Sequence, residues 1–189
     1  MDWSNNRQLK LAAKWMHLGE TVAYPTEAVW GLGCDPSNPN AVAKLLRLKS
    51  RPVEKGLILI AADITQFEPL LKRLSPAQRR ELEHSWPGPF TWIVPATNAV
   101  PDWIRGQHQG VALRVTDHPV AAALCRAFGG PIVSTSANPA NRRAARTALA
   151  VRRYFGSQIA VITPGQVGTR KQASEIRDLI SGRVLRGPG

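Results

Sequence analysis

Short apolar runs alternate with amphipathic helical segments along most of this 189-residue chain. The clearest run is the unbroken apolar segment 57–61, which is typical of a buried strand. Segments 7–18 and 40–48 instead repeat apolar residues at intervals of three and four, which indicates helices with one buried face. The alternation predicts an α/β fold on a large sheet, and the short connection between 94 and 111 favours some antiparallel pairing.

The ends of several elements can also be placed. Ser75 followed by Pro76 is typical of a helix N-terminus, because serine caps the helix and proline fits its first turn. No linker or repeat interrupts the pattern, so we expect a single domain over residues 1–189. The expected helices are 7–18, 40–48, 75–85, 118–128 and 147–155, and the expected strands are 21–24, 57–61, 90–95, 111–115, 131–135, 159–163, 174–179 and 184–186.

The positive charge of the chain is large and unevenly distributed. Lys and Arg number 25 and Asp and Glu number 13, which gives a net charge of +12. Residues 118–174 contain eight basic side chains and no acidic one. Such a field attracts polyanions, nucleic acids and nucleotides first of all, although a basic surface can also serve solubility alone.

The cysteine and histidine content excludes other classes of protein. Cys34 and Cys125 are far apart and the four histidines are scattered, which excludes a disulfide scaffold and a cysteine-rich zinc site. The first residues do not read as a signal peptide, and no apolar run is long enough to span a bilayer. We expect no metal site, no membrane association and a reduced, cytoplasmic location.

Three polar clusters could carry chemistry, and the first follows a predicted strand. Thr26 and Glu27 come directly after Pro25, and Gly31 and Gly33 lie close behind. Ligands dock at strand ends in open α/β sheets, so Thr26 could bind a small polar substrate. A plain turn capped by Thr26 explains the same residues.

The second cluster contains Lys49, Arg51 and Lys55, between the end of a helix and a buried strand. In an extended segment Lys49 and Arg51 would point to the same side and could clamp a triphosphate. The alternative is that these cations only complement the dipole of the helix C-terminus.

The third cluster is a buried strand that delivers Ser134, Thr135 and Ser136, followed by Asn138. Burying such groups without partners costs about 1–3 kcal/mol each. Capping alone needs only one or two of them, so we expect them to line a site. Arg114 sits inside another apolar strand, where an arginine needs an anion unless the strand lies at a solvent-exposed edge.

Six motifs in this order resemble the YrdC family, most closely its short single-domain type. They are Pro-Thr-Glu at 25–27, Lys-x-Arg-Pro at 49–52, Trp-Pro-Gly-Pro-x-Thr at 86–91, Arg-Val at 114–115, Ser-x-Ser-Ala-Asn at 134–138 and Ser-Glu-Ile-Arg-Asp at 174–178. The resemblance covers residues 9–186 and implies an α/β fold, in which a twisted mixed β-sheet with flanking helices surrounds a large concave basic cavity.

The resemblance also implies an activity, the synthesis of threonylcarbamoyl-AMP. Such enzymes join L-threonine, bicarbonate (or CO2) and ATP, which carries Mg²⁺, and release pyrophosphate. Their product serves the N6-threonylcarbamoyladenosine modification of tRNAs that read codons beginning with A. The resemblance therefore implies tRNA, or proteins of the tRNA-modification complex, as partners.

Site residues follow from the same resemblance. Lys49, Arg51, Ser136 and Asn138 match catalytic residues that also bind ATP. The segment after Asn138 departs from the family, since relatives often have a small residue and glycine where this chain has 139–144. The remaining implied residues are Thr26, Lys55, Thr91, Arg114 and Ser174 for threonine or the carbamate, and Ser134 and Arg186 for ATP.

Two other classes of function remain open at this point. A non-catalytic module that binds double-stranded RNA or tRNA would explain the charge, although the low aromatic content of 6% speaks against it. A carbamoyl-transferring domain of a larger maturation factor is related in fold, but a short free-standing chain fits it less well.

Overall fold

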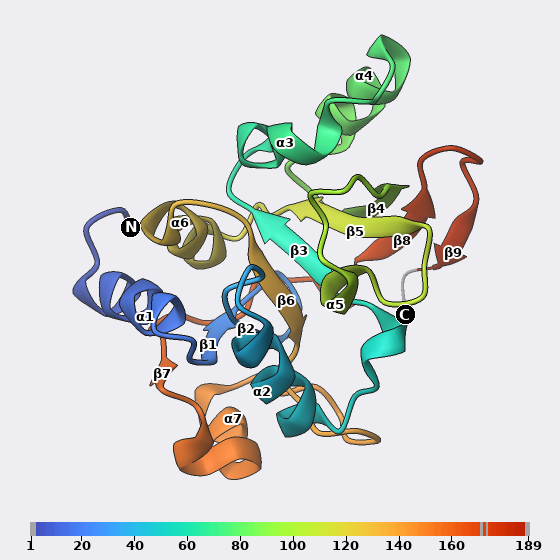
Figure 1. The fold of residues 1–189 in the computed structure, drawn as a ribbon. Helices are drawn as coiled ribbons and strands as arrows, with labels where there is room; N and C mark the ends of the chain where they lie inside the picture. The colour runs from blue at the N-terminus through green and yellow to red at the C-terminus, as the bar shows by residue number, and fades with distance from the viewer. Residues whose placement is uncertain (1–2, 171, 173, 188–189) are drawn as a thin grey trace.

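A mixed β-sheet organises the structure (Figure 1). The computed structural model describes residues 3–170, 172 and 174–187. Within them the strands pair in the order β7-β1-β2-β6-β3-β5-β4-β8-β9. Their bounds are β1 Val22–Pro25, β2 Trp30–Gly33, β3 Ile58–Ala61, β4 Phe90–Pro95, β5 Gly110–Val115, β6 Ile132–Ser136, β7 Val161–Ile162, β8 Glu175–Asp178 and β9 Val184–Arg186.

The sheet combines both kinds of strand pairing. The pairs β1–β7, β3–β5 and β4–β8 are parallel. The other neighbouring pairs in the described sheet are antiparallel. Strand β6 joins the two halves, because it pairs with β2 on one side and with β3 on the other. The predicted mixed α/β sheet is confirmed.

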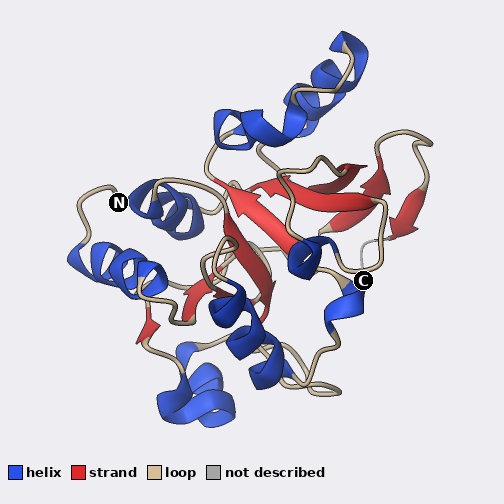
Figure 2. Cartoon of the chain, in the orientation of Figure 1, coloured by secondary structure: helices blue, strands red, loops and turns tan. Residues whose placement is uncertain are grey.

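Helices surround the sheet (Figure 2). Several begin where the sequence supplies a cap, and at α4 Ser75 and Gln78 form a reciprocal capping box. Helices α1, α2 and α7 have simpler caps, in which the side chain of Asn6, Asn38 or Thr147 accepts hydrogen bonds from backbone N–H groups of the first turn. The helices are α1 Arg7–His17, α2 Pro39–Lys49, α3 Glu68–Leu71, α4 Pro76–Ser85, α5 Asp102–Arg105, α6 Pro119–Phe128 and α7 Ala148–Phe155.

Each face of the sheet has its own core. Helices α1 and α6 pack together over one face, where Met16 and Leu124 meet Ile60 of β3. The next residue on β3, Leu59, points to the opposite face and joins a core with Leu45 of α2. The side-chain period of two along β3 therefore divides the apolar residues between two cores.

Strand β2 was not predicted, because its two glycines read as a turn. Both glycines lie against the ring of Tyr24 on the neighbouring strand. A Cβ atom at Gly33 would come within 2.6 Å of the Val133 carbonyl oxygen and 2.8 Å of the Tyr24 ring. The glycines are required by contacts across the sheet, which local propensity does not reveal.

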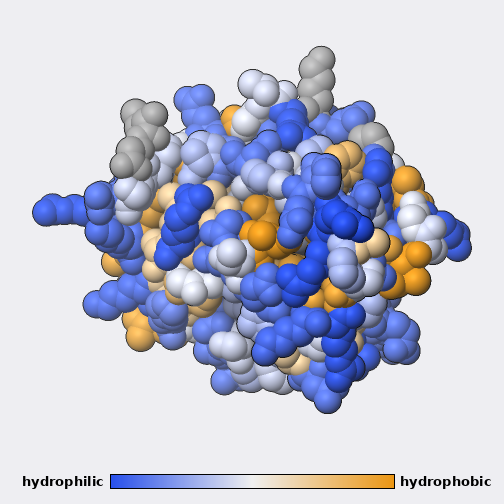
Figure 3. Space-filling model, turned by 90° about the horizontal axis from the view of Figure 1, so that it is seen from above, coloured by the Kyte–Doolittle hydropathy of each residue, from blue (hydrophilic) through white to orange (hydrophobic). Residues whose placement is uncertain are grey.

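Helix lengths, surface hydropathy and the state of the cysteines complete the description of the fold. In the described part of the chain no helix is both long and apolar enough to cross a membrane. The face seen in Figure 3 is mostly hydrophilic, with small hydrophobic patches between polar side chains. Cys34 and Cys125 are both buried as free thiols.

Candidate active site

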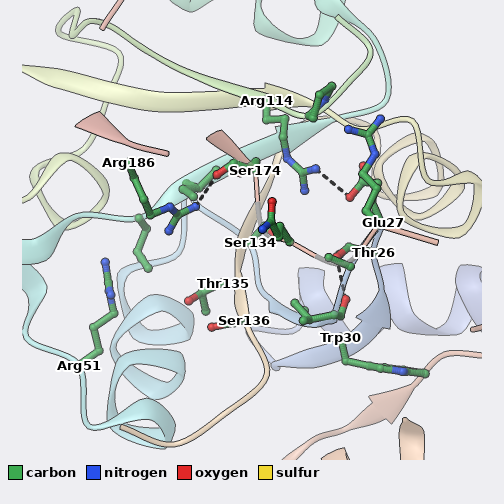
Figure 4. Close-up of a pocket in the computed structure, with 18 residues that line it drawn as sticks. Thr26, Glu27, Trp30, Arg51, Arg114, Ser134, Thr135, Ser136, Ser174 and Arg186 are labelled. Carbon is green, nitrogen blue, oxygen red and sulfur yellow. Dashed lines mark hydrogen bonds and ion pairs between the residues drawn. The ribbon is translucent and has the colours of Figure 1, made fainter. Parts of the chain in front are cut away.

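A cavity of about 220 Å³ opens on the face of the sheet that α1 and α6 cover elsewhere. Strand β6 shows how it arises. Ile132 lies in the core with α1 and α6, whereas Ser134 and Ser136, two and four residues further on the same face, line the cavity. The strand thus carries apolar side chains where helices cover it and hydroxyls where they do not (Figure 4).

Seven of the residues predicted from the sequence line this first cavity. Four arginines and one carboxylate contribute to its lining among the described residues. The predicted residues that line it are Thr26, Arg51, Arg114, Ser134, Ser136, Ser174 and Arg186. The structure therefore brings together side chains from β5, β6, the β1–β2 turn, the segment after α2 and the C-terminal hairpin.

Three arginines form a row along the cavity, with the guanidinium of Arg186 between those of Arg51 and Arg114 (Figure 4). We call Arg51, Arg186 and Arg114 the arginine row. Burial and the neighbouring charge of Arg114 lower the pKa of Arg186. Burial and the charge of Arg186 do the same to the pKa of Arg51. Such partly desolvated, mutually repelling cations favour an anionic ligand with several charges.

Arg114 is held by the chain itself. Its Nη1 donates to Oε2 of Glu27 at 2.7 Å, and both side chains are at most one-tenth exposed. The hydroxyl of Thr116 donates to Oε1 of the same carboxylate at 2.5 Å. The expectation that a buried Arg114 needs an anion is confirmed, and β5 is an inner strand of the sheet.

Hydrogen bonds also fix the hydroxyl groups around the cavity. The Thr26 hydroxyl donates to the Val29 carbonyl at 2.7 Å and closes the β1–β2 turn. Thr91 is fully buried behind the lining, and its hydroxyl shares a 2.8 Å hydrogen bond with that of Ser174. Arg186 donates to the Ser174 carbonyl oxygen at 2.9 Å. Thr91 therefore acts on the cavity only through Ser174.

Lys49 and Arg51 do not lie in an extended segment, and that expectation is wrong. Helix α2 continues to Lys49, and Ser50 ends it in the left-handed conformation with φ 48°. The turn separates the two cations. Arg51 donates to the Gly56 carbonyl oxygen at 2.8 Å and lines the cavity, whereas Lys49 turns towards the loop after β6.

Lys49 and Asn138 hold that loop. The Lys49 ammonium group donates to the carbonyl oxygens of Ser136 and Asn138, the latter at 2.8 Å. The Asn138 amide donates to the Arg142 carbonyl oxygen at 2.7 Å. We call Lys49, Ser136 and Asn138 the loop clamp. Burial and the charge of Arg51 lower the pKa of Lys49 to about 8. Lys49 and Asn138 are not among the lining residues of the cavity.

A second cavity of about 420 Å³ adjoins the first and shares Arg51 and Arg186 with it. Lys55 and His108 lie at this cavity, together with apolar side chains such as Ile104. Lys55, predicted to bind threonine or the carbamate, is thus separated from Thr26 and Arg114 at the first cavity.

The structure adds lining residues to which the sequence analysis gave no role. Glu27 was part of the first cluster, yet it received no role. The buried Arg114 was the signal that an acidic partner had to exist. Arg170 and Thr135 also line the first cavity, and Arg170 pairs with Asp117 at 2.8 Å. Arg170 comes from a loop after β7 that carries no recognisable motif.

Over residues 3–170, 172 and 174–187, no group of three or more His, Cys, Asp or Glu side chains is arranged to hold a metal ion. The described lining of the first cavity is instead rich in arginine and hydroxyl side chains.

Known proteins resemble this chain over nearly its whole length. It is 57% identical over 186 residues to a threonylcarbamoyl-AMP synthase from Cellvibrio japonicus, covering 98% of both chains. A protein of the same name from Pseudomonas aeruginosa is 53% identical and covers 93% of this chain and 94% of its own.

Solved structures show the same fold. P. abyssi Sua5, crystallised with L-threonine, superposes with a TM-score of 0.89 at 32% identity over 96% of this chain. The match spans 54% of Sua5, so this chain is about half its length. E. coli YciO matches with a TM-score of 0.84 at 24% identity, covering 96% of this chain and 89% of its own. A family model for Sua5, YciO and YrdC, described as telomere recombination, matches residues 14–187. Its range takes in both cavities, the arginine row and the loop clamp, and this chain is a member of the Sua5/YciO/YrdC family.

Proposed function

We propose that the protein is a threonylcarbamoyl-AMP synthase, a nucleotidyltransferase that joins L-threonine, bicarbonate or CO2, and ATP. The observation that carries the proposal is the arginine row beside the hydroxyls of β6 in one cavity. The names of the relatives and the threonine complex of P. abyssi Sua5 support the same reading. They favour an enzyme over a module that only binds RNA.

The proposed reaction has two steps. The neutral amine of threonine attacks the carbon of CO2 and gives up a proton to solvent, or attacks the carbon of bicarbonate with loss of water, and the product is a carbamate. A carbamate oxygen then attacks the α-phosphorus of ATP, and the bond from that phosphorus to the bridging oxygen of pyrophosphate breaks. No covalent intermediate with the protein is required, because positioning and charge stabilisation supply the rate enhancement.

The site residues divide between the two substrates. We assign Arg51, Arg186, Ser134 and Ser136 to the phosphates of ATP, whose bound Mg²⁺ enters with the nucleotide and is held by its oxygens and water. Arg114, Thr26 and Ser174 are assigned to threonine or its carbamate, and Thr91 supports Ser174.

The loop clamp has a different part in the proposal. In the structure the Lys49 ammonium group donates to carbonyl oxygens of the clamp. Lys49 and Asn138 therefore act by ordering the loop that follows Ser136 at the end of β6. Direct contact of Lys49 with phosphate requires its ammonium group to exchange these carbonyl oxygens for phosphate oxygens. We reassign Lys55 from threonine to ATP, because it lines the second cavity, which adjoins the first at Arg51 and Arg186.

We further propose that residues 1–189 work as one domain in the cytoplasm. The net charge of +12 supports contact with tRNA or with proteins that modify it. The product of the proposed reaction is a mixed anhydride, so a partner that accepts the threonylcarbamoyl group has to collect it.

The deciding experiment measures pyrophosphate released by the purified protein with ATP, Mg²⁺ and bicarbonate, with and without L-threonine. We expect release that depends on L-threonine and is weaker with L-serine, which lacks the methyl group. Absence of release under every combination, together with RNA binding that weakens as salt is added, would instead support the RNA-binding module.

A further inference from the structure

Glu27 is the one carboxylate in the described lining of the first cavity, where it faces the arginine row. Its carboxylate accepts hydrogen bonds from Arg114 at 2.7 Å, from Thr116 at 2.5 Å and from the backbone N–H of Asp117 at 3.2 Å. Only 6% of Glu27 is exposed, so the group is held on several sides within the protein.

The backbone around Glu27 is fixed as tightly as its side chain. Its carbonyl oxygen accepts from the N–H of Arg170 at 3.1 Å, and the Thr26 carbonyl oxygen accepts from the N–H of Gly168 at 3.0 Å. A Cβ atom at Gly168 would lie 2.8 Å from the Glu27 carbonyl oxygen. The close packing leaves Glu27 little freedom to turn away from Arg114.

The ionisation of Glu27 decides how charge is distributed in the cavity. Burial alone would raise its pKa, but the Arg114 guanidinium and the Thr116 hydroxyl outweigh burial and lower the pKa to about 2. The carboxylate is therefore ionised at neutral pH and offsets the charge of Arg114.

The other lining arginines differ in this respect. Arg170 is paired with Asp117, whereas Arg51 and Arg186 form no ion pair within the described part of the chain. The first cavity therefore has a neutralised end at Glu27 and Arg114 and a cationic end at Arg51 and Arg186.

We propose that Glu27 is a positioning residue that directs the two substrates to opposite ends of the first cavity. It holds the Arg114 guanidinium in place for the single carboxylate or carbamate of the amino-acid substrate. By offsetting the charge of Arg114, it also leaves the polyphosphate to Arg51 and Arg186. This inference rests on the proposed function for the identity of the substrates, but its electrostatic part concerns only where an anion binds.

The test is Glu27→Gln, which keeps the size of the side chain and removes its charge. We expect the KM for L-threonine to rise about tenfold or more, since one charge-assisted hydrogen bond to Arg114 is lost. The kcat should change less than the KM. Added inorganic pyrophosphate should compete with L-threonine in the variant but not in the unmodified protein, because Arg114 then attracts phosphate.

Glu175→Gln is the matched control. Glu175 also pairs with an arginine, Arg177, but neither side chain lines a cavity. We expect its KM for L-threonine and its pattern of pyrophosphate inhibition to be unchanged. A Glu27→Gln variant that matches the unmodified protein in both measurements, or a Glu175→Gln variant that shows the same changes, would overturn the proposal.

Binding of inorganic pyrophosphate, followed by thermal shift without turnover, separates this inference from the proposed function. We expect Glu27→Gln to bind pyrophosphate several-fold more tightly than the unmodified protein. Equal binding would sink the electrostatic part even in an active synthase, and tighter binding would uphold it even if threonine-dependent activity were absent.

Thr116→Val covers the case in which Glu27→Gln fails to fold. It removes one donor to the carboxylate and leaves every charge in place. We expect a rise of about threefold in the KM for L-threonine, with the pyrophosphate pattern unchanged. An unchanged KM in a folded Thr116→Val variant would contradict the positioning role.

Discussion

The loop clamp and the arginine row adjoin each other, yet they use positive charge in different ways. Lys49 turns its ammonium group to carbonyl oxygens of the chain, whereas Arg51, two residues later, lines both cavities. The Arg51 side chain also has a buried Nε without a hydrogen-bond partner. Neighbouring cations in one motif can therefore serve structure in one case and ligand binding in the other.

Arg51→Met should give the largest effect, because it removes a cation that we assign to the phosphates. A lost charge-stabilising donor lowers kcat by about 10² to 10³. We expect such a loss of pyrophosphate release, with only a modest loss of unfolding free energy from the missing 2.8 Å hydrogen bond to the Gly56 carbonyl oxygen. Arg51 is partly desolvated and repelled by Arg186, so its removal relieves unfavourable terms as well.

If Arg51→Met lost much stability but no turnover, Arg51 would serve structure rather than ligand binding. Arg51→Lys is the matched control, since it keeps the charge and loses the planar fork. We expect the activity of Arg51→Lys to lie between that of the unmodified protein and that of Arg51→Met.

Lys49→Met should separate the two regions through stability. It leaves the Asn138 carbonyl oxygen without its donor, and the Ser136 carbonyl oxygen keeps only the Asn138 N–H, at a cost of about 1–3 kcal/mol. We expect a lower free energy of unfolding in urea than for Arg51→Met. A Lys49→Met variant as stable as the unmodified protein would show that the clamp does not hold the loop.

The pH dependence sharpens the comparison further. The pKa of Lys49 is lowered to about 8, so half of the Lys49 side chains have lost their proton at that pH. We expect pyrophosphate release to fall as the pH rises through about 8, because the neutral amine has fewer donors for the clamp. In Lys49→Arg the fall should move to higher pH, since arginine keeps its proton.

The contribution of Lys49 to the free energy of unfolding should rise with pH, whereas the activity should fall. Because its pKa is lower in the folded chain than in the unfolded one, the unfolded chain binds more protons between about pH 8 and its ordinary pKa. The difference in unfolding free energy between the unmodified protein and Lys49→Met should therefore grow over that range. A constant difference from pH 7 to pH 10 would contradict a lowered pKa.

Thr91→Val should have the smallest effect. It removes the 2.8 Å hydrogen bond to the Ser174 hydroxyl while keeping a side chain of similar shape. A net loss of about 0.5–1.5 kcal/mol corresponds to a KM for L-threonine raised by about two- to tenfold. The KM for ATP should not change. A change in the KM for ATP with no change in the KM for L-threonine would show that Thr91 was assigned to the wrong substrate.

Much of the fold could be predicted because local rules decide it. The capping residues Ser75 and Thr147 mark the starts of α4 and α7, and β4 has its predicted bounds. Arg114 inside an apolar strand correctly required an anion. What failed depended on distant partners: β2 owes its glycines to Tyr24 and Val133, on other strands. The short helices α3 and α5, of four residues each, carry too little periodicity to be recognised.

For the site, the sequence predicted which residues take part more accurately than it predicted where their side chains point. The sequence indicated which cations and hydroxyls belong together, and seven of them line one cavity. The opposite turns taken by Lys49 and Arg51 depend on the left-handed Ser50 and on carbonyl groups from β6. Whether each predicted residue touches a substrate stays a prediction that the variants above decide.

The position of β6 between β2 and β3 affects how the site is lost when the protein unfolds. Its backbone is bonded on both sides, so neither half of the sheet can open without exposing it. We infer that the amide protons of β6 exchange with solvent mainly through large-scale unfolding. Ser134 and Ser136 would then stay in place until the sheet itself opens. Moderate destabilisation elsewhere should reduce the amount of folded protein rather than the activity of each folded molecule.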